Sequence, residues 1–155
     1  MVTRGWWRAG WLVAAALMGG GAGPDFGMPV ASEVEVAAFL PRLNEAAARA
    51  DSSALCGMVS YPVRVGSQGR RRAALVRDVR HCEARFSDVF TPALLRSMAA
   101  LTMAGLRPSN RMFSAENGLY WIGKYYGGPQ GEAPLHVDFS DARFWKVGLV
   151  GIVRE

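Results

Sequence analysis

The sequence predicts one α+β domain in which helices come first and a sheet follows. Apolar residues recur every three or four positions from residue 33 to about 103, which is the period of an amphipathic helix. From residue 111 onward the period falls to two, and a β-branched and aromatic run covers 143–153. Half of the 155 residues are hydrophobic, so the chain can bury one globular core but is too short for several.

The first helix is expected to begin at a capping box. Ser32 is the N-cap and Glu35 follows three residues later. The apolar face then comprises Val36, Phe39, Leu40, Leu43 and Ala47. Pro41 lies inside this helix and has no backbone N–H to donate, which predicts a kink. Asp51 is a second N-cap signal and predicts a short helix through Met58.

Residues 61–65, with the sequence YPVRV, predict a short strand, and Pro62 places it either at an edge of the sheet or at the start of the strand. Leu75, Val76, Val79, Cys82, Phe86 and Phe90 have helical spacing. They predict a helix over 73–90. Thr91-Pro92 combines an N-cap with proline at the first helical position, so another helix is expected to follow it.

The last third of the chain predicts the sheet. Residues 111–114 have strand character, and Glu116-Asn117-Gly118 forms a hairpin turn into the aromatic segment 119–126. Residues 135–139 alternate in polarity, and 143–153 predict a long final strand.

The N-terminus has the pattern of a secretory signal peptide. Arg4 and Arg8 precede an apolar stretch over 9–20, and small residues follow it. Cleavage is expected after Ala22, with a second candidate site after Ala31. The apolar stretch is shorter than the roughly 20 residues that a membrane-spanning helix needs. We therefore expect export to the periplasm or the medium.

These signals divide the chain into a signal peptide over 1–22, a linker over 23–31 and a domain over 32–155. Removal of Arg4 and Arg8 lowers the net charge from +5 to +3. No later segment is long and apolar enough to span a bilayer. The basic segment that begins with Arg70-Arg71-Arg72 is interpreted as solvated surface, because export and the small net charge argue against nucleic acid as a partner.

Cys56 and Cys82 are the two cysteines of the chain. An oxidising compartment favours a disulfide between them, which stabilises the fold by roughly 3 kcal/mol through loop-closure entropy. The alternative is two buried free thiols that act as small hydrophobic side chains.

His136 and Asp138 are the candidates for catalysis. Residues two apart on a strand share a face, so the carboxylate could orient the imidazole as a general base. The same alternation buries Leu135, Val137 and Phe139, which would leave His136 and Asp138 in solvent. Two ligands do not complete a metal site, so neither a metal nor another cofactor is expected.

Aromatic residues are frequent in the predicted strands, and a curved sheet can use some of them to line an apolar cavity. The set comprises Tyr61, Tyr120, Trp121, Tyr125, Tyr126, Phe144 and Trp145. Most of the set is expected to pack in the core. The candidates for ligand binding are Tyr61, Tyr120, Trp121 and Trp145.

Three segments resemble the nuclear transport factor 2-like superfamily, which includes ketosteroid-isomerase-like and SnoaL-like proteins. They are the strand 61–65 after two helices, the Phe-Thr-Pro step within 86–92, and the Gly-containing hairpin within 114–122. The resemblance implies N-terminal helices packed on a curved antiparallel sheet, forming a cone with a pocket. Pro41 and the loop over 127–134 depart from the family pattern. No Asp or Tyr matches the family's catalytic positions, so none is assigned.

The resemblance implies a pocket without implying a reaction, because the superfamily includes isomerases, dehydratases, cyclases and binding modules. The favoured interpretation is an exported, non-enzymatic pocket protein that binds an apolar small molecule or a protein partner. One alternative is an isomerase-like or dehydratase-like enzyme with a buried acid or base. Another is an envelope module that forms a homodimer without a ligand.

Overall fold

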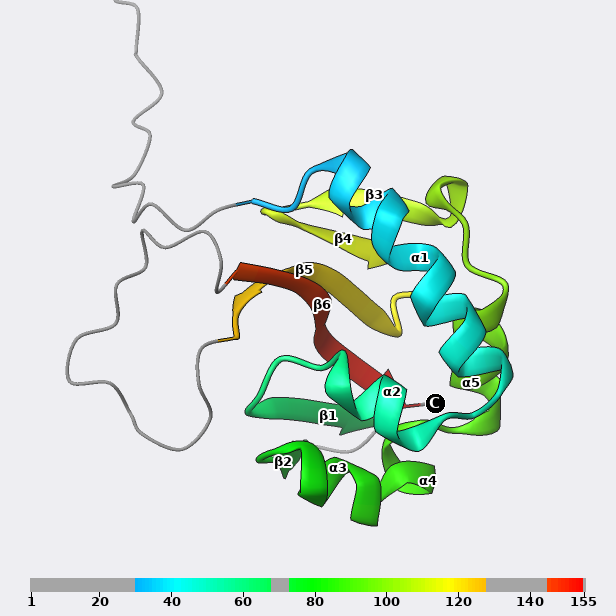
Figure 1. Ribbon diagram of the computed structural model, residues 1–155, viewed down its shortest axis with the longest axis vertical. Coiled ribbons are helices and arrows are strands. Elements are labelled where there is room, and N and C mark those ends of the chain that lie inside the picture. Colours follow the sequence, from blue (N-terminus) through cyan, green and yellow to red (C-terminus); the bar gives the residue numbers. More distant parts are fainter. Residues whose placement is uncertain (1–29, 68–72, 128–144, 155) are drawn as a thin grey trace, which may run out of the picture.

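A computed structural model of the chain describes residues 30–67, 73–127 and 145–154 (Figure 1). The predicted signal peptide over 1–22 lies outside the described residues. So does the predicted strand over 135–139, with the two candidates for catalysis, His136 and Asp138.

The helices are α1 (Glu33–Ala48), α2 (Ser52–Gly57), α3 (Val79–Ala84), α4 (Phe86–Val89), α5 (Pro92–Ala99) and the 3-10 turn η1 (Met103–Gly105). Of these, α1, α2 and α5 begin where the predicted caps place them. Ser32 and Glu35 form the complete capping box of α1. Asp51 and Thr91 accept backbone N–H groups at the starts of α2 and α5. Helix α1 continues through Pro41 to Ala48.

Within the described residues, the sheet has six strands in the order β2-β1-β6-β5-β4-β3 and is not closed. The strands are β1 (Val63–Ser67), β2 (Ala74–Val76), β3 (Leu106–Ser109), β4 (Met112–Ala115), β5 (Tyr120–Tyr126) and β6 (Trp145–Arg154). The pair β1 and β6 is parallel, while every other neighbouring pair is antiparallel. The sheet is therefore mixed, and the expectation of an antiparallel sheet is wrong. The sheet is mixed because the chain enters β1 from α2 and so runs beside β6, the last strand, in the same direction.

The expectation of one helix over 73–90 is also wrong. Ala74–Val76 is a strand that pairs with β1, and Leu75 is exposed although helical spacing would bury it. The helical part begins at Asp78, whose carboxylate accepts the N–H of His81 at 2.8 Å. Pairing with β1 thus overrides the helical period in the first part of the segment.

The core lies between α1, the shorter helices and the sheet. Buried apolar residues of α1 and α5 join those of the central strands in one cluster, including Val36, Leu43, Leu94, Met98, Ile122, Leu149 and Ile152. Asn44 reinforces the contact between the two helices by donating its amide to the carbonyl oxygens of Met98 and Leu101, at 2.6 and 3.1 Å. The Met98 carbonyl also accepts the Leu101 N–H at 3.3 Å, so the Asn44 amide joins the backbone bonds that close the end of α5.

Cys56 of α2 and Cys82 of α3 form a disulfide, and both residues are fully buried. The bridge ties α2 to the α3 region on the same side of β1 and β2 (Figure 1). Among the helices in the described part of the chain, none has the length and apolar character to cross a bilayer.

Candidate functional site

A cleft with a volume of about 520 Å³ lies between α1, the end of α2 and the first half of β6. We call it the α1–β6 cleft. Its lining residues are Glu35, Ala38, Phe39, Arg42, Gly57, Met58, Tyr125, Lys146 and Val147. The volume falls in the range of roughly 300–1,000 Å³ that is typical of small-molecule sites.

The end of α2 is fixed to β6 by two backbone hydrogen bonds. The Leu149 N–H donates to the Met58 carbonyl, and the Ser60 N–H donates to the Leu149 carbonyl, both at 2.8 Å. Gly148 permits this close approach, because a Cβ at this position would collide with the Met58 carbonyl oxygen and lie 2.6 Å from the Tyr125 ring. A glycine next to the cleft thus sets the positions of both Met58 and Tyr125.

The exposed lining of the α1–β6 cleft is mixed, with more polar than apolar surface. Phe39 and Met58 line it but are almost buried, whereas Val147 of β6 and Tyr125 of β5 are partly exposed. Ala38 is exposed on α1 and faces the open space of the cleft.

Glu35 is already neutralised by an ion pair. Lys124 of β5 places its Nζ 2.7 Å from the Glu35 carboxylate, and the Lys124 side chain is only 17% exposed. The hydrogen bond from Lys124, together with the one from the Ser32 backbone N–H, lowers the pKa of Glu35 to about 2. Glu35 is therefore a carboxylate near neutral pH and a poor proton acceptor.

The substitution Glu35→Gln tests this ion pair without removing the capping box, since glutamine serves at the same capping position. Because the folded-state pKa of about 2 lies below the ordinary 4.5, the stabilisation is present above pH 4.5 and is lost as the pH falls towards 2. Urea unfolding at pH 7 should show Glu35→Gln less stable by about 0.5–1 kcal/mol, the range for an exposed pair. The difference should shrink at pH 3.

Glu33→Gln is the matched control, because it removes the same charge from the first turn of α1 without touching Lys124. A loss of stability that is equal for the two variants, or unchanged between pH 7 and pH 3, would contradict a specific role for the Glu35–Lys124 pair.

Arg42 and Tyr125 approach the α1–β6 cleft from opposite elements, α1 and β5. Burial raises the pKa of the Tyr125 hydroxyl, and the positive charge of Arg42 opposes that rise. Within the described residues, Arg42 and Lys146 form no ion pair. The cleft thus carries two cations and one neutral hydroxyl donor besides the neutralised Glu35.

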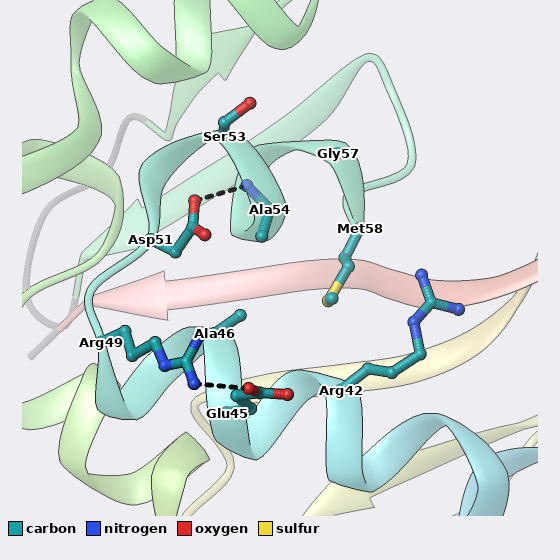
Figure 2. A pocket seen from close by; sticks show the side chains of 9 residues that line it. All are labelled: Arg42, Glu45, Ala46, Arg49, Asp51, Ser53, Ala54, Gly57 and Met58. Carbon is teal, nitrogen blue, oxygen red and sulfur yellow. Dashed lines mark hydrogen bonds and ion pairs between the residues drawn. The ribbon is translucent and has the colours of Figure 1, made fainter.

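A second cleft of about 430 Å³ adjoins the first and shares Arg42, Gly57 and Met58 with it. Its other charged groups already have partners (Figure 2). Arg49 pairs with Glu45 at 2.8 Å, and the Asp51 carboxylate accepts the Ala54 N–H at 2.9 Å. In this view Arg42 extends away from the Glu45–Arg49 pair. The α1–β6 cleft is therefore the better candidate for a ligand.

None of the four aromatic candidates for ligand binding lines the α1–β6 cleft. Tyr61 is partly buried and donates its hydroxyl to the Cys56 carbonyl at 2.7 Å, beside the disulfide. Tyr120 is fully buried in the core, with its hydroxyl 3.4 Å from Ser97 Oγ. Neither residue lines the α1–β6 cleft.

The two tryptophans lie elsewhere on the sheet. The Trp121 ring covers Gly151. Trp145 packs edge-on against Tyr126, with ring centroids 6.0 Å apart, and lines a separate cleft of about 190 Å³. That volume is below the usual size of a small-molecule site. The residues described contain no cluster of three or more His, Cys, Asp or Glu side chains that could hold a metal ion.

No protein-family model, curated protein or solved structure matches the chain. The resemblance to the nuclear transport factor 2-like superfamily therefore rests on the three short segments of the sequence alone.

Sequence reasoning missed most residues of the α1–β6 cleft. Tyr125 belongs to the aromatic set but was not among its four candidates. Glu35 was interpreted only as a capping residue, and that role is confirmed beside its contact with Lys124. Arg42 follows Pro41 on the exposed face of α1, and no local pattern distinguishes it from the other arginines. The contact between α1 and β5 joins residues far apart in the sequence, so only the fold brings this site together.

Proposed function

We propose that this chain is an exported binding protein that holds a small molecule with an apolar part in the α1–β6 cleft. The observation that carries the proposal is the cleft itself, about 520 Å³ in volume, whose lining combines Val147 and Tyr125 with the cations Arg42 and Lys146. A pocket of this size between helices and a sheet also supports the cone that the family resemblance implies.

Export after removal of residues 1–22 is part of the proposal. The disulfide between Cys56 and Cys82 supports it, because structural disulfides persist in oxidising compartments and are rare in the cytosol. The order of basic, apolar and small residues at the N-terminus also supports export.

Binding without acid–base catalysis is favoured over an isomerase-like or dehydratase-like activity. A general base works best with a pKa near the operating pH, whereas the pKa of Glu35 is about 2. Tyr125 supplies a hydroxyl to the described lining. Burial raises the pKa of this hydroxyl, so it stays protonated. Both groups are suited to hold a ligand rather than to move a proton.

Native mass spectrometry of the protein purified from the cells that make it tests the proposal. The expected spectrum contains the processed chain with an additional small-molecule mass that is lost on activation in the gas phase. A spectrum of the bare chain would contradict ligand binding, and a homodimer without any added mass would favour the interaction module instead.

A further inference from the structure

We infer that the α1–β6 cleft selects an organic monocarboxylate with an apolar body, the chemistry of a fatty acid. This inference rests on the proposed function and adds the class of ligand. It follows from the charges that line the cleft, from a backbone N–H directed to its edge, and from the apolar side chains among its lining residues.

The charges in the cleft favour an anion. The Glu35 carboxylate is compensated by Lys124 at 2.7 Å. Arg42 and Lys146 line the same cleft, and neither forms an ion pair within the described ranges. An anionic group would gain both cations and would be placed beside the Tyr125 hydroxyl, a further donor.

The backbone of β6 supplies another donor. Leu149 directs its N–H and carbonyl away from β5, since both bond to the chain at Met58 and Ser60. Val147 lies two residues earlier on β6 and is paired with Lys124. Its N–H and carbonyl therefore also point away from β5. Strand β1 pairs only with residues 152–154 of β6, so no described strand covers Val147. Its N–H is therefore directed to the sheet edge that borders the cleft.

A carboxylate group fits this arrangement. The planar guanidinium of Arg42 can bind both oxygens of a carboxylate. Val147 and Tyr125 line the cleft and are partly exposed, so they offer surface to the apolar body of the ligand, while Phe39 and Met58 are almost buried in the same lining.

Isothermal titration with three twelve-carbon probes, each below its micelle concentration, tests the inference. Dodecanoate carries a negative charge, dodecanol none, and dodecyltrimethylammonium a positive charge. Dodecanoate is expected to bind the wild-type protein at least about tenfold more tightly than dodecanol, because bonds to charged groups contribute about 1.5–3 kcal/mol each. Dodecyltrimethylammonium is expected to bind most weakly.

Arg42→Met removes the charge but keeps a long apolar side chain, and should lower the affinity for dodecanoate about tenfold while leaving dodecanol unchanged. The affinity of Arg42→Lys for dodecanoate should lie between those of the wild type and Arg42→Met, since lysine keeps the charge but loses the planar fork. Arg49→Met is the matched control on α1 and should bind dodecanoate as the wild type does, because Arg49 does not line the α1–β6 cleft. Arg42 is exposed, so circular dichroism should show each variant folded.

Equal affinities for dodecanoate and dodecanol, no binding of dodecanoate, or an Arg42→Met variant that binds dodecanoate normally would each overturn the inference. The proposed function is judged separately by native mass spectrometry. An added neutral mass on the purified protein would leave the binding function standing while contradicting the choice of a carboxylate.

Discussion

Replacing both cysteines with alanine, as Cys56→Ala/Cys82→Ala, is expected to lower the free energy of unfolding by about 3 kcal/mol. The bridge closes a loop with a sequence separation of 26, and its loss returns chain entropy to the unfolded state. Both side chains are fully buried, so the alanines also remove packed atoms between α2 and α3. Urea unfolding followed by circular dichroism measures the difference.

The wild-type protein unfolded in the presence of a thiol reductant provides an independent comparison and should lose a similar amount of stability. Ser53→Ala, at an exposed position of α2, is the control and should unfold nearly as the wild type does. If the double variant lost less than about 1 kcal/mol, the disulfide would not be the main link between α2 and α3.

Gly148→Ala is expected to destabilise the protein by about 1–3 kcal/mol, the usual cost of inserting atoms where there is no space. The new Cβ would collide with the carbonyl oxygen of Met58 and lie 2.6 Å from the Tyr125 ring. The carbonyl belongs to the backbone and accepts the Leu149 N–H, so it cannot move without weakening that bond. The displacement of Met58 and Tyr125 should also weaken ligand binding in the α1–β6 cleft.

Gly57→Ala is the control in the same cleft. No atom lies within 4 Å of the position that its Cβ would take, so this variant should match or slightly exceed the stability of the wild type. Chemical unfolding of the two variants side by side measures both effects. A Gly148→Ala protein as stable as Gly57→Ala would show that the approach of Met58 to β6 is not tight.

Features of the fold that depend on neighbouring residues were predictable from the sequence. The capping residues Ser32, Asp51 and Thr91 mark helix starts because each satisfies a backbone N–H within its own first turn. The turn before β5 contains Gly118, whose φ of 68° lies in the left-handed region that glycine adopts readily. Such signals need no information about distant parts of the chain.

Features that depend on distant pairing were not predictable in the same way. Strand β2 forms because Ala74–Val76 pairs with β1, although the same residues fit a helical period. The parallel contact of β1 with β6 joins segments separated by most of the domain, and no local pattern encodes its direction. Strand β3 (Leu106–Ser109) also gave no clear signal, and only its pairing with β4 defines it.

The candidate site illustrates the same division. The sequence could indicate that aromatic residues would gather in the strands, but not which of them would border a cleft. Tyr125 does so because it lies opposite Lys146 in the β5–β6 pair and next to Gly148. Tyr120 is in the same strand, yet its pairing with Ile152 places it in the core. Register, rather than residue type, separates these two tyrosines.

The central claim is that the α1–β6 cleft holds the ligand, and native mass spectrometry of two variants tests it most directly. Ala38→Trp places an indole in the cleft from an exposed position of α1, so the fold should persist while the space is filled. Ala37→Trp adds the same group at the neighbouring exposed position, which does not line the cleft. Each variant is made and purified in the same cells as the wild type.

Wild-type protein and Ala37→Trp are expected to carry the added small-molecule mass, and Ala38→Trp is expected to lack it. An Ala38→Trp protein that keeps this mass, with an occupancy equal to that of Ala37→Trp, would contradict the assignment of the ligand to the α1–β6 cleft.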